Sequence, residues 1–157
     1  AYKIGGRYKI YAPYSDVKRA SNTTKKHVQG LKQLVRKDYI IILTSSLKDV
    51  MCLYSLGYNA IALQSEMQMP SEEFIKMLKE RFDILLLLYD NDYDKDPNPG
   101  QMMANKITTK YNFDNLIIPD KYKCKDISDL IKAFGIDEAH KLMKNLIYEK
   151  IRKKEEE

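Results

Sequence analysis

Apolar residues are concentrated in four short runs along the chain. These runs are Tyr39–Leu43, Asn59–Leu63, Ile84–Tyr89 and Asp114–Ile118. A continuous apolar run is typical of a strand buried on both faces, because an amphipathic helix has a polar residue at every third or fourth position. We therefore expect four buried strands, each followed by a turn and a more polar stretch.

The stretches between these runs have the features of helices. Ser46 to Asp49 resembles a capping box, and Gly57 suits the end of the same helix. The expected helices run from Ser46 to Tyr54, from Pro70 to Lys79, from Pro99 to Lys110 and from Asp126 to Phe134. Because strands and helices alternate, the sequence predicts an α/β fold with a four-stranded, mainly parallel sheet and helices on both faces.

The two ends of the chain differ from this repeating pattern. Gly5-Gly6 separates two short tyrosine-rich segments, which predicts a β-hairpin from Tyr2 to Tyr14. We expect Ser15–Thr24 to be loop, and His27–Val35 to be either a short helix or a turn followed by a strand. After Gly135, an apolar residue every three or four positions predicts a C-terminal helix, and the charged tail Arg152–Glu157 is expected to fray.

Composition is that of an ordinary globular protein of 157 residues with 44% hydrophobic and 31% charged residues. No apolar stretch reaches the roughly 20 residues that span a bilayer, so we expect no membrane association, and we find no signal peptide. Cys52 and Cys124 have no metal-ligand spacing, which favours free thiols and a cytoplasmic location. Because the sequence begins with Ala1, we expect it to be a piece of a longer chain.

Charge is distributed unevenly along the sequence. Residues 1–38 hold ten basic and two acidic residues, a formal charge of +8, which leaves −3 for the remainder of a chain whose total is +5. A basic segment followed by an acidic site is typical of a metal-dependent protein that handles nucleic acid. The tyrosines of the predicted hairpin alternate with basic residues, a combination that suits base stacking and phosphate binding, although tyrosine is also a common strand residue.

Aspartates follow the Ile84–Tyr89 run at alternate positions: Asp90, Asp92, Asp94 and Asp96. Functional groups of a parallel sheet collect where its strands end, and hard divalent ions prefer carboxylate oxygens. A magnesium site is one interpretation, and an acidic surface loop is the other, since Asp is also a common turn residue. A calcium loop of the EF-hand type is excluded because Lys95 and Gln101 occupy positions that require Gly and Glu.

The order of these motifs resembles a Toprim domain, the metal-binding module of bacterial and phage DNA primases, topoisomerases and some nucleases. The resemblance covers about residues 39–135 and rests on Lys48-Asp49, the Asp90-x-Asp92 motif after a buried strand, and Lys125-Asp126. The segments 18–22 and 28–31 resemble, more loosely, the basic subdomain that precedes this module in primases. The resemblance therefore implies three regions: a basic N-terminal segment (1–38), a Toprim domain (39–135), and a C-terminal helix with its tail (136–157).

This resemblance to primases implies RNA primer synthesis on a single-stranded DNA template from NTPs with Mg2+ or Mn2+, in partnership with a replicative helicase. Asp90, Asp92 and Asp126 would hold metal, Asp49 would support the site, and Asp129 or Ser128 is a further candidate. The residues expected to contact the template or nucleotide phosphates are Arg7, Lys9, Lys18, Asn22, Lys25, Lys26 and Lys48.

One departure from the family pattern concerns its first motif, Glu-Gly-x-x-Asp. Ser45 stands at the Glu position when the motif is aligned on Asp49, and a serine hydroxyl supplies neither negative charge nor a comparable base. Glu66 is the candidate replacement, because it follows a neighbouring strand whose end lies about 5 Å away; the alternative is that Glu66 is a plain loop residue. Two other functions remain open: a catalytically degenerate Toprim DNA-binding module of a helicase-like protein, and a Toprim nuclease.

Overall fold

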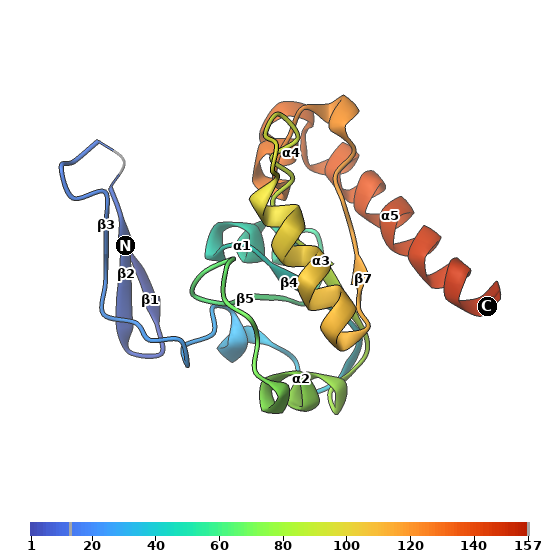
Figure 1. Ribbon diagram of the computed structural model, residues 1–157, viewed down its shortest axis with the longest axis horizontal. Helices are drawn as coiled ribbons and strands as arrows, with labels where there is room; N and C mark the ends of the chain where they lie inside the picture. Colours follow the sequence, from blue (N-terminus) through green and yellow to red (C-terminus); the bar gives the residue numbers. More distant parts are fainter. Residues whose placement is uncertain (13, 157) are drawn as a thin grey trace.

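A four-stranded parallel sheet forms the centre of the protein (Figure 1), as a computed structural model describes it for residues 1–12 and 14–156. Its strand order is β5-β4-β6-β7, which confirms the predicted α/β sheet. The strands are β4 (Asp38–Thr44), β5 (Ala60–Ala62), β6 (Phe82–Leu88) and β7 (Asp114–Asn115). Because β4 and β5 are neighbours, the loops that follow them lie side by side at the carboxyl edge.

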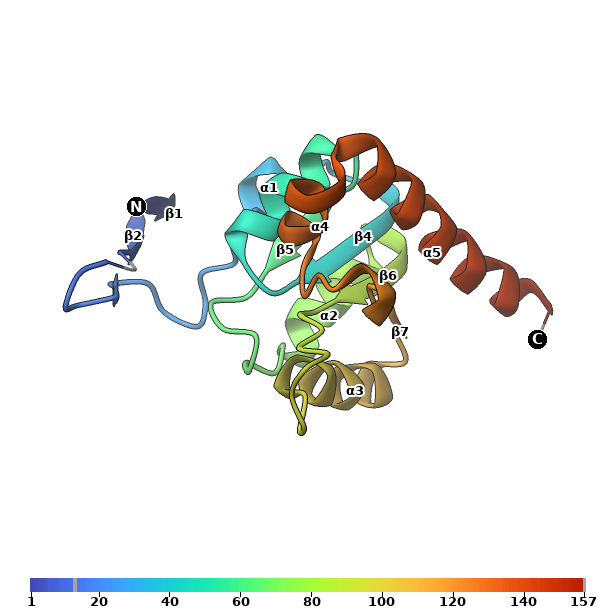
Figure 2. The same ribbon diagram turned by 90° about the horizontal axis from the view of Figure 1, so that it is seen from above.

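Helices cover both faces of this sheet (Figure 2). One face carries α1 (Leu47–Ser55), α4 (Ile127–Phe134) and α5 (Ile136–Glu156). The other carries α2 (Glu72–Lys79) and α3 (Pro99–Tyr111). The central strands are apolar at almost every position because alternate side chains enter two different cores.

Polar residues at the helix N-termini explain where the helices begin. Ser46, Ser71, Asn98 and Asp126 each accept a hydrogen bond from the backbone N–H three residues later, which satisfies one of the free donors of the first turn. Asp126 is therefore held in place by the helix that it caps. This matters for the site, because its carboxylate is fixed before any ligand arrives.

The N-terminal segment forms a separate antiparallel sheet beside the parallel one (Figure 1). The predicted hairpin is confirmed as β1 (Tyr2–Ile4) and β2 (Arg7–Tyr11), while Pro13 lies outside the described residues. A third strand, β3 (Arg19–Ser21), pairs with β2, so the expectation of loop is wrong at those positions. All three β3 residues are exposed, which leaves no apolar pattern to indicate a strand.

The connection to the parallel sheet also differs from expectation. A single bridge joins Gln29 to Ala62, and a short 3-10 helix, η1 (Leu31–Gln33), follows; neither a helix nor a full strand spans His27–Val35. Gly30 has a φ of 83°, and a Cβ there would lie 2.9 Å from the carbonyl oxygen of Ala60. The left-handed backbone at Gly30 interrupts both helix and strand geometry, and this close approach suits a residue without a Cβ.

The remaining differences lie towards the end of the chain. β7 is shorter than the predicted Asp114–Ile118 strand, although Leu116 still donates its N–H to the Leu87 carbonyl. A second 3-10 helix, η2 (Asp120–Tyr122), follows it. α5 continues to Glu156, and Glu157 lies outside the described residues, while fraying of the charged tail stays a prediction. No helix within the described residues is long and apolar enough to cross a bilayer.

Replacing Leu86 tests how far the sheet depends on its central strand. The Leu86 side chain is 1% exposed between β6 and the helices of the first face. We expect Leu86→Ala to lower the free energy of unfolding by about 2 to 5 kcal/mol, because it removes buried methyl groups and leaves a cavity. Urea unfolding monitored by circular dichroism measures the change. Asp83→Ala, at an exposed position of the same strand, is the control, and an equal loss for both variants would contradict this packing.

Candidate metal centre

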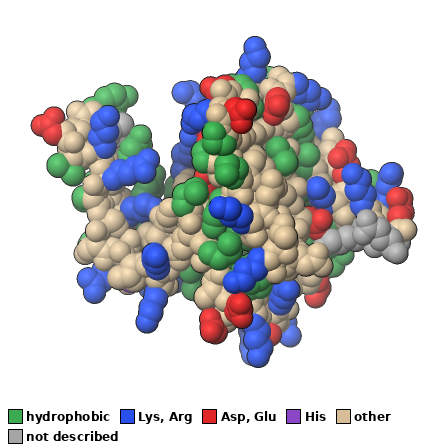
Figure 3. All heavy atoms as spheres, viewed as in Figure 1, with side chains coloured by type: hydrophobic (Ala, Val, Ile, Leu, Met, Phe, Trp, Pro, Cys, Tyr) green, Lys and Arg blue, Asp and Glu red, His purple; other side chains and the backbone are tan. Residues whose placement is uncertain are grey.

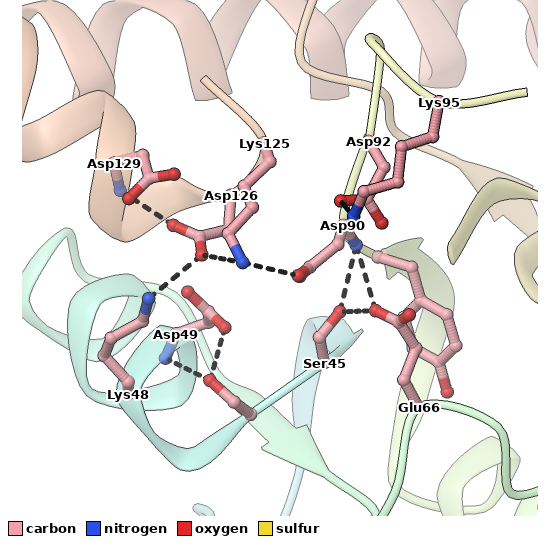
Figure 4. Close-up of polar contacts among 12 residues, drawn as sticks. Ser45, Lys48, Asp49, Glu66, Asp90, Asp92, Lys95, Lys125, Asp126 and Asp129 are labelled. Carbon is pink, nitrogen blue, oxygen red and sulfur yellow. Dashed lines mark hydrogen bonds and ion pairs between the residues drawn. The ribbon is translucent and has the colours of Figure 1, made fainter. Parts of the chain in front are cut away.

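Three carboxylates from three different elements meet at the carboxyl edge of the sheet (Figure 4). Asp49 lies in the first turn of α1, Asp90 lies two residues after β6, and Asp126 caps α4. One ligand atom from each lies within 4.8 Å of the other two. We call these residues the carboxylate cluster. The first and last of these residues, Asp49 and Asp126, lie 77 positions apart in the sequence. All three meet because parallel strands end at a common edge.

The carboxylate cluster has the chemistry of a divalent metal site. Asp49 is 1% exposed, and its Oδ1 atom is buried without a hydrogen-bond partner. A buried polar atom without a partner is costly, so this atom fits a ligand that the described residues do not supply. Mg2+ and Mn2+ prefer oxygen ligands. The unpaired oxygen beside two further carboxylates therefore fits such an ion.

Burial raises the pKa values of three acids at this edge: Asp49, Glu66 and Asp90. The pKa of Asp49 rises to about 7, first because the group is buried and then because Asp126 lies nearby. Burial also raises the pKa values of Asp90 and Glu66; the Lys125 charge opposes the shift of Asp90, and the hydrogen bond donated by Ser45 opposes that of Glu66. Full ionisation of the cluster is therefore unfavourable unless a cation binds there.

Two lysines supply part of that positive charge in the structure. Lys48 Nζ lies 2.9 Å from Asp126 Oδ2, and Lys125 Nζ lies 3.4 Å from Asp90 Oδ2 and 4.0 Å from Asp126 Oδ2. Burial lowers the pKa of each lysine, but the neighbouring carboxylates outweigh it and the net shift is upward. Lys48 is predicted to contact phosphates, and here its ammonium group lies on a carboxylate instead.

Glu66 lies against Ser45, the residue that stands where the family has glutamate (Figure 4). The Ser45 hydroxyl donates a short hydrogen bond to Glu66 Oε2 and accepts one from the Asp90 N–H at 3.0 Å. The same N–H also donates to Glu66 Oε2 at 3.2 Å. The loop after β5 thus brings a carboxylate next to the Ser45 position and joins it to the backbone of Asp90.

Asp92 lies outside the carboxylate cluster. Its carboxylate pairs with Lys95 at 2.7 Å, and its side chain is 14% exposed. It is nonetheless close enough for its charge to contribute to the raised pKa of Glu66. Asp129, the further candidate, is half-buried on α4 and donates its backbone N–H to Asp126 Oδ1 at 2.7 Å. Asp94 and Asp96 are exposed.

The other residues predicted to bind nucleic acid lie in the N-terminal segment. Arg7, Lys18, Lys25 and Lys26 are exposed. Two others have structural hydrogen bonds: Lys9 Nζ donates to the Gln64 carbonyl at 2.9 Å, and Asn22 Oδ1 accepts from the Tyr8 N–H at 2.7 Å. Figure 3 shows basic and hydrophobic side chains gathered on this segment. Its exposed apolar residues include Tyr8, Ile10, Tyr11 and Tyr14.

Two residues that sequence reasoning did not identify shape the cluster. A Cβ at Gly100 would lie 2.2 Å from the Asp90 carbonyl oxygen and 3.2 Å from Glu66 Oε1. Gln101 Nε2 donates to the carbonyl oxygens of Tyr89 and Asp90 at 3.3 and 3.2 Å. The start of α3 therefore packs directly on the loop after β6 that carries Asp90, Asp92, Asp94 and Asp96, which we call the metal loop. The Asn-Pro-Gly sequence at positions 98–100 indicates a helix start, but not this close approach.

Asp49→Asn tests whether the Asp49 carboxylate is buried without a partner that stabilises its ionised form. The Asp49 pKa of about 7 exceeds its ordinary 3.8, so between these values the native state keeps a proton that the unfolded state has lost. Stability of the metal-free wild type therefore falls as pH rises through this window. The neutral amide removes the effect: we expect equal stability near about pH 4 and a variant more stable by roughly 2 to 4 kcal/mol near about pH 8.

The measurement is urea unfolding in EDTA at several pH values. Asp94→Asn, which removes an exposed charge from the metal loop, is the control and should show no such dependence. A stability difference between Asp49→Asn and wild type that stays constant across this pH range would contradict the raised pKa.

Gly100→Ala tests the contact between α3 and the metal loop. Because the added methyl group would overlap the Asp90 carbonyl, we expect the free energy of unfolding to fall by about 1 to 3 kcal/mol and Mn2+ affinity to fall roughly tenfold or more. Calorimetric titration measures the affinity. Asn105→Ala, on an exposed face of α3, is the control. Unchanged Mn2+ binding by a folded Gly100→Ala protein would show that the contact does not shape the site.

The fold can be compared with known proteins. No protein-family model and no curated protein sequence matches the chain. Among solved structures, a DnaG primase catalytic domain bound to ssDNA matches 89% of this chain and 48% of its own, with a TM-score of 0.64 and 16% identity. The chain thus spans about half the length of that protein.

A second match is a chain in an assembly of bacteriophage T7 lagging-strand DNA polymerase with the primase domains of two gp4 subunits, bound to an RNA/DNA hybrid and dTTP. It covers 83% of this chain and 64% of its own, with a TM-score of 0.56 and 13% identity. Both the parallel sheet and its surrounding helices therefore have a known counterpart. The chain has the Toprim-type fold of primase catalytic domains.

Proposed function

We propose that this chain is the catalytic part of a DNA primase, which makes RNA primers on single-stranded DNA by metal-dependent nucleotidyl transfer. The observation that carries the proposal is the carboxylate cluster at the sheet edge, in which Asp49 has a buried, unpaired oxygen. The primase-like fold supports it. So does the basic, tyrosine-rich sheet beside the domain, which offers cations for phosphates and rings for bases.

Asp49, Asp90 and Asp126 are the residues that we assign to metal binding, with Mg2+ or Mn2+ as the ion. When bound, such a metal would supply the positive charge that nucleotidyl transfer needs at the reacting phosphate. Gln101 and the cap of α4 hold Asp90 and Asp126 before the metal binds. Because these two residues are already in place, the reaction does not have to supply free energy to reorient them.

Glu66 is the residue that we assign to the place of the missing family glutamate. Its carboxylate is held by the Ser45 hydroxyl and by the Asp90 N–H. It therefore adds negative charge beside Asp90, where the serine alone supplies none. Asp92 lies close enough to influence Glu66, and we propose it as a further metal-binding residue in the complete complex.

The lysines of the site have a second proposed role, towards phosphates. Lys48 and Lys125 neutralise the cluster in the metal-free protein. A bound divalent ion would take over this neutralisation, which leaves both ammonium groups available to the triphosphate of an incoming NTP. Arg7, Lys18, Lys25 and Lys26, all exposed, are proposed to contact the template backbone, and a replicative helicase is the proposed partner of the whole protein.

A priming assay with the full-length protein tests this function. The reaction contains single-stranded DNA, NTPs and Mg2+ or Mn2+, and labelled products are resolved on gels. We expect Asp90→Asn to abolish primers. Glu66→Gln should lower synthesis by about two orders of magnitude, the scale expected when one electrostatic contact to the transition state is lost. Asp94→Asn removes an exposed charge from the same loop and is the control.

Each alternative outcome has a distinct meaning. Full activity of Glu66→Gln, with Asp90→Asn inactive, would reduce Glu66 to a loop residue and leave the primase proposal standing. DNA binding without primers by the folded full-length protein would overturn it in favour of a degenerate Toprim module, which the serine at position 45 favours. Metal-dependent nicking of DNA would identify a nuclease instead.

A further inference from the structure

The loop that carries Glu66 is also the place where the N-terminal segment is attached. Among the described residues, every hydrogen bond from residues 2–29 to the parallel-sheet domain ends on the segment 62–68. Gln29 pairs with Ala62 through two backbone bonds, and Gln68 Nε2 donates to the Lys25 carbonyl at 3.0 Å. Within the part of the chain that the structure describes, residues 2–29 are therefore hydrogen-bonded to the domain only at the last residue of β5 and along the loop that follows it.

Gln64 is at the centre of this attachment. Its carbonyl oxygen accepts from Lys9 Nζ at 2.9 Å, its Oε1 accepts from the Thr23 hydroxyl at 2.7 Å, and its Nε2 donates to the His27 carbonyl at 2.7 Å. One half-buried residue thus joins β2, the segment after β3, and the connection to the domain. No other residue of this loop has described hydrogen bonds to three separate parts of the N-terminal segment.

The position of Gln64 in the sequence links this attachment to the carboxylates. Glu66 follows two residues later, so at most about 7 Å of backbone separates the two Cα atoms. Between them, Ser65 Oγ accepts from the Met67 N–H at 3.2 Å, which stabilises the turn. At its far end, Glu66 is bonded to Ser45 and to the Asp90 N–H. Gln64 is therefore joined to the backbone of Asp90 through a short, internally bonded loop.

We propose that Gln64 is a positioning residue that couples binding of a single-stranded polynucleotide on the N-terminal sheet to metal binding at the carboxylate cluster. The N-terminal sheet is held to the domain by few hydrogen bonds. A polynucleotide that contacts both the sheet and the domain therefore restricts the positions of Gln64 and of Glu66. A coupling of this kind is reciprocal: the polynucleotide tightens metal binding, and the metal tightens polynucleotide binding by the same factor. The inference rests on the proposed function, because it requires both ligands to bind.

The test measures binding without catalysis, using the full-length protein without NTPs. Free Mn2+ is determined by electron paramagnetic resonance in the presence and absence of an oligo(dT) strand, with the Mn2+ bound by the oligonucleotide alone subtracted. For the wild type we expect the strand to tighten Mn2+ binding about fivefold or more. Gln64→Met, which keeps the length of the side chain and removes both of its hydrogen bonds, should reduce this factor to less than about twofold.

Control variants separate coupling from a general loss of structure. Gln64→Met should bind each ligand alone to within about threefold of the wild type, since no group that touches either ligand has changed. Gln33→Met changes an exposed glutamine of η1 and should keep the full coupling. Thr23→Val removes one Gln64 partner without touching the loop and should weaken the coupling even if Gln64→Met fails to fold.

The possible failures are distinguishable. A wild-type protein that binds neither Mn2+ nor oligo(dT) would overturn the proposed function. A wild-type protein that binds both with no mutual effect would overturn the coupling and leave the proposed function in place. If the wild type shows coupling and both Gln64→Met and Thr23→Val retain it, Gln64 is not the residue that transmits it.

Discussion

Repulsion among carboxylates at one edge of a parallel sheet is the constraint on which the site depends. Asp49, Asp90 and Asp126 meet where the strands end, and burial makes the charges of Asp49 and Asp90 more costly. The protein balances this cost locally with two lysines and with the cap of α4. Both cores beneath the cluster are apolar, so the fold provides a rigid base that holds like charges together instead of letting them separate.

Much of the fold follows from the sequence because the parallel strands are buried on both faces and appear as apolar runs. β3 does not follow, since all three of its residues are exposed and its pairing depends on backbone bonds to β2. The alternate spacing of the aspartates after β6 does not indicate which carboxylates converge, and only Asp90 of that series lies in the cluster. The structure brings Asp49 and Asp126 to Asp90 and pairs Asp92 with Lys95, a distinction set by tertiary packing.

Contacts between loops and other segments are the hardest to anticipate. Neighbouring strands suffice to predict that Glu66 lies near position 45, because β4 and β5 pair side by side. No periodic pattern in the sequence indicates the close approach of Gly100 to the Asp90 carbonyl or the attachment at Gln64. Both contacts meet the loops around Glu66 and Asp90, so the site is shaped by segments that contribute no carboxylate of their own.

Asp126 divides its carboxylate between two tasks. Oδ1 accepts from the Asp129 N–H and begins α4, whereas Oδ2 faces Lys48 and Lys125. Oδ2 is therefore the oxygen that would hold an ion, in exchange for its contacts with the two lysines, while Oδ1 keeps the capping hydrogen bond. One side chain thus serves the helix and the site together, so replacing Asp126 would weaken the start of α4 as well as the cluster.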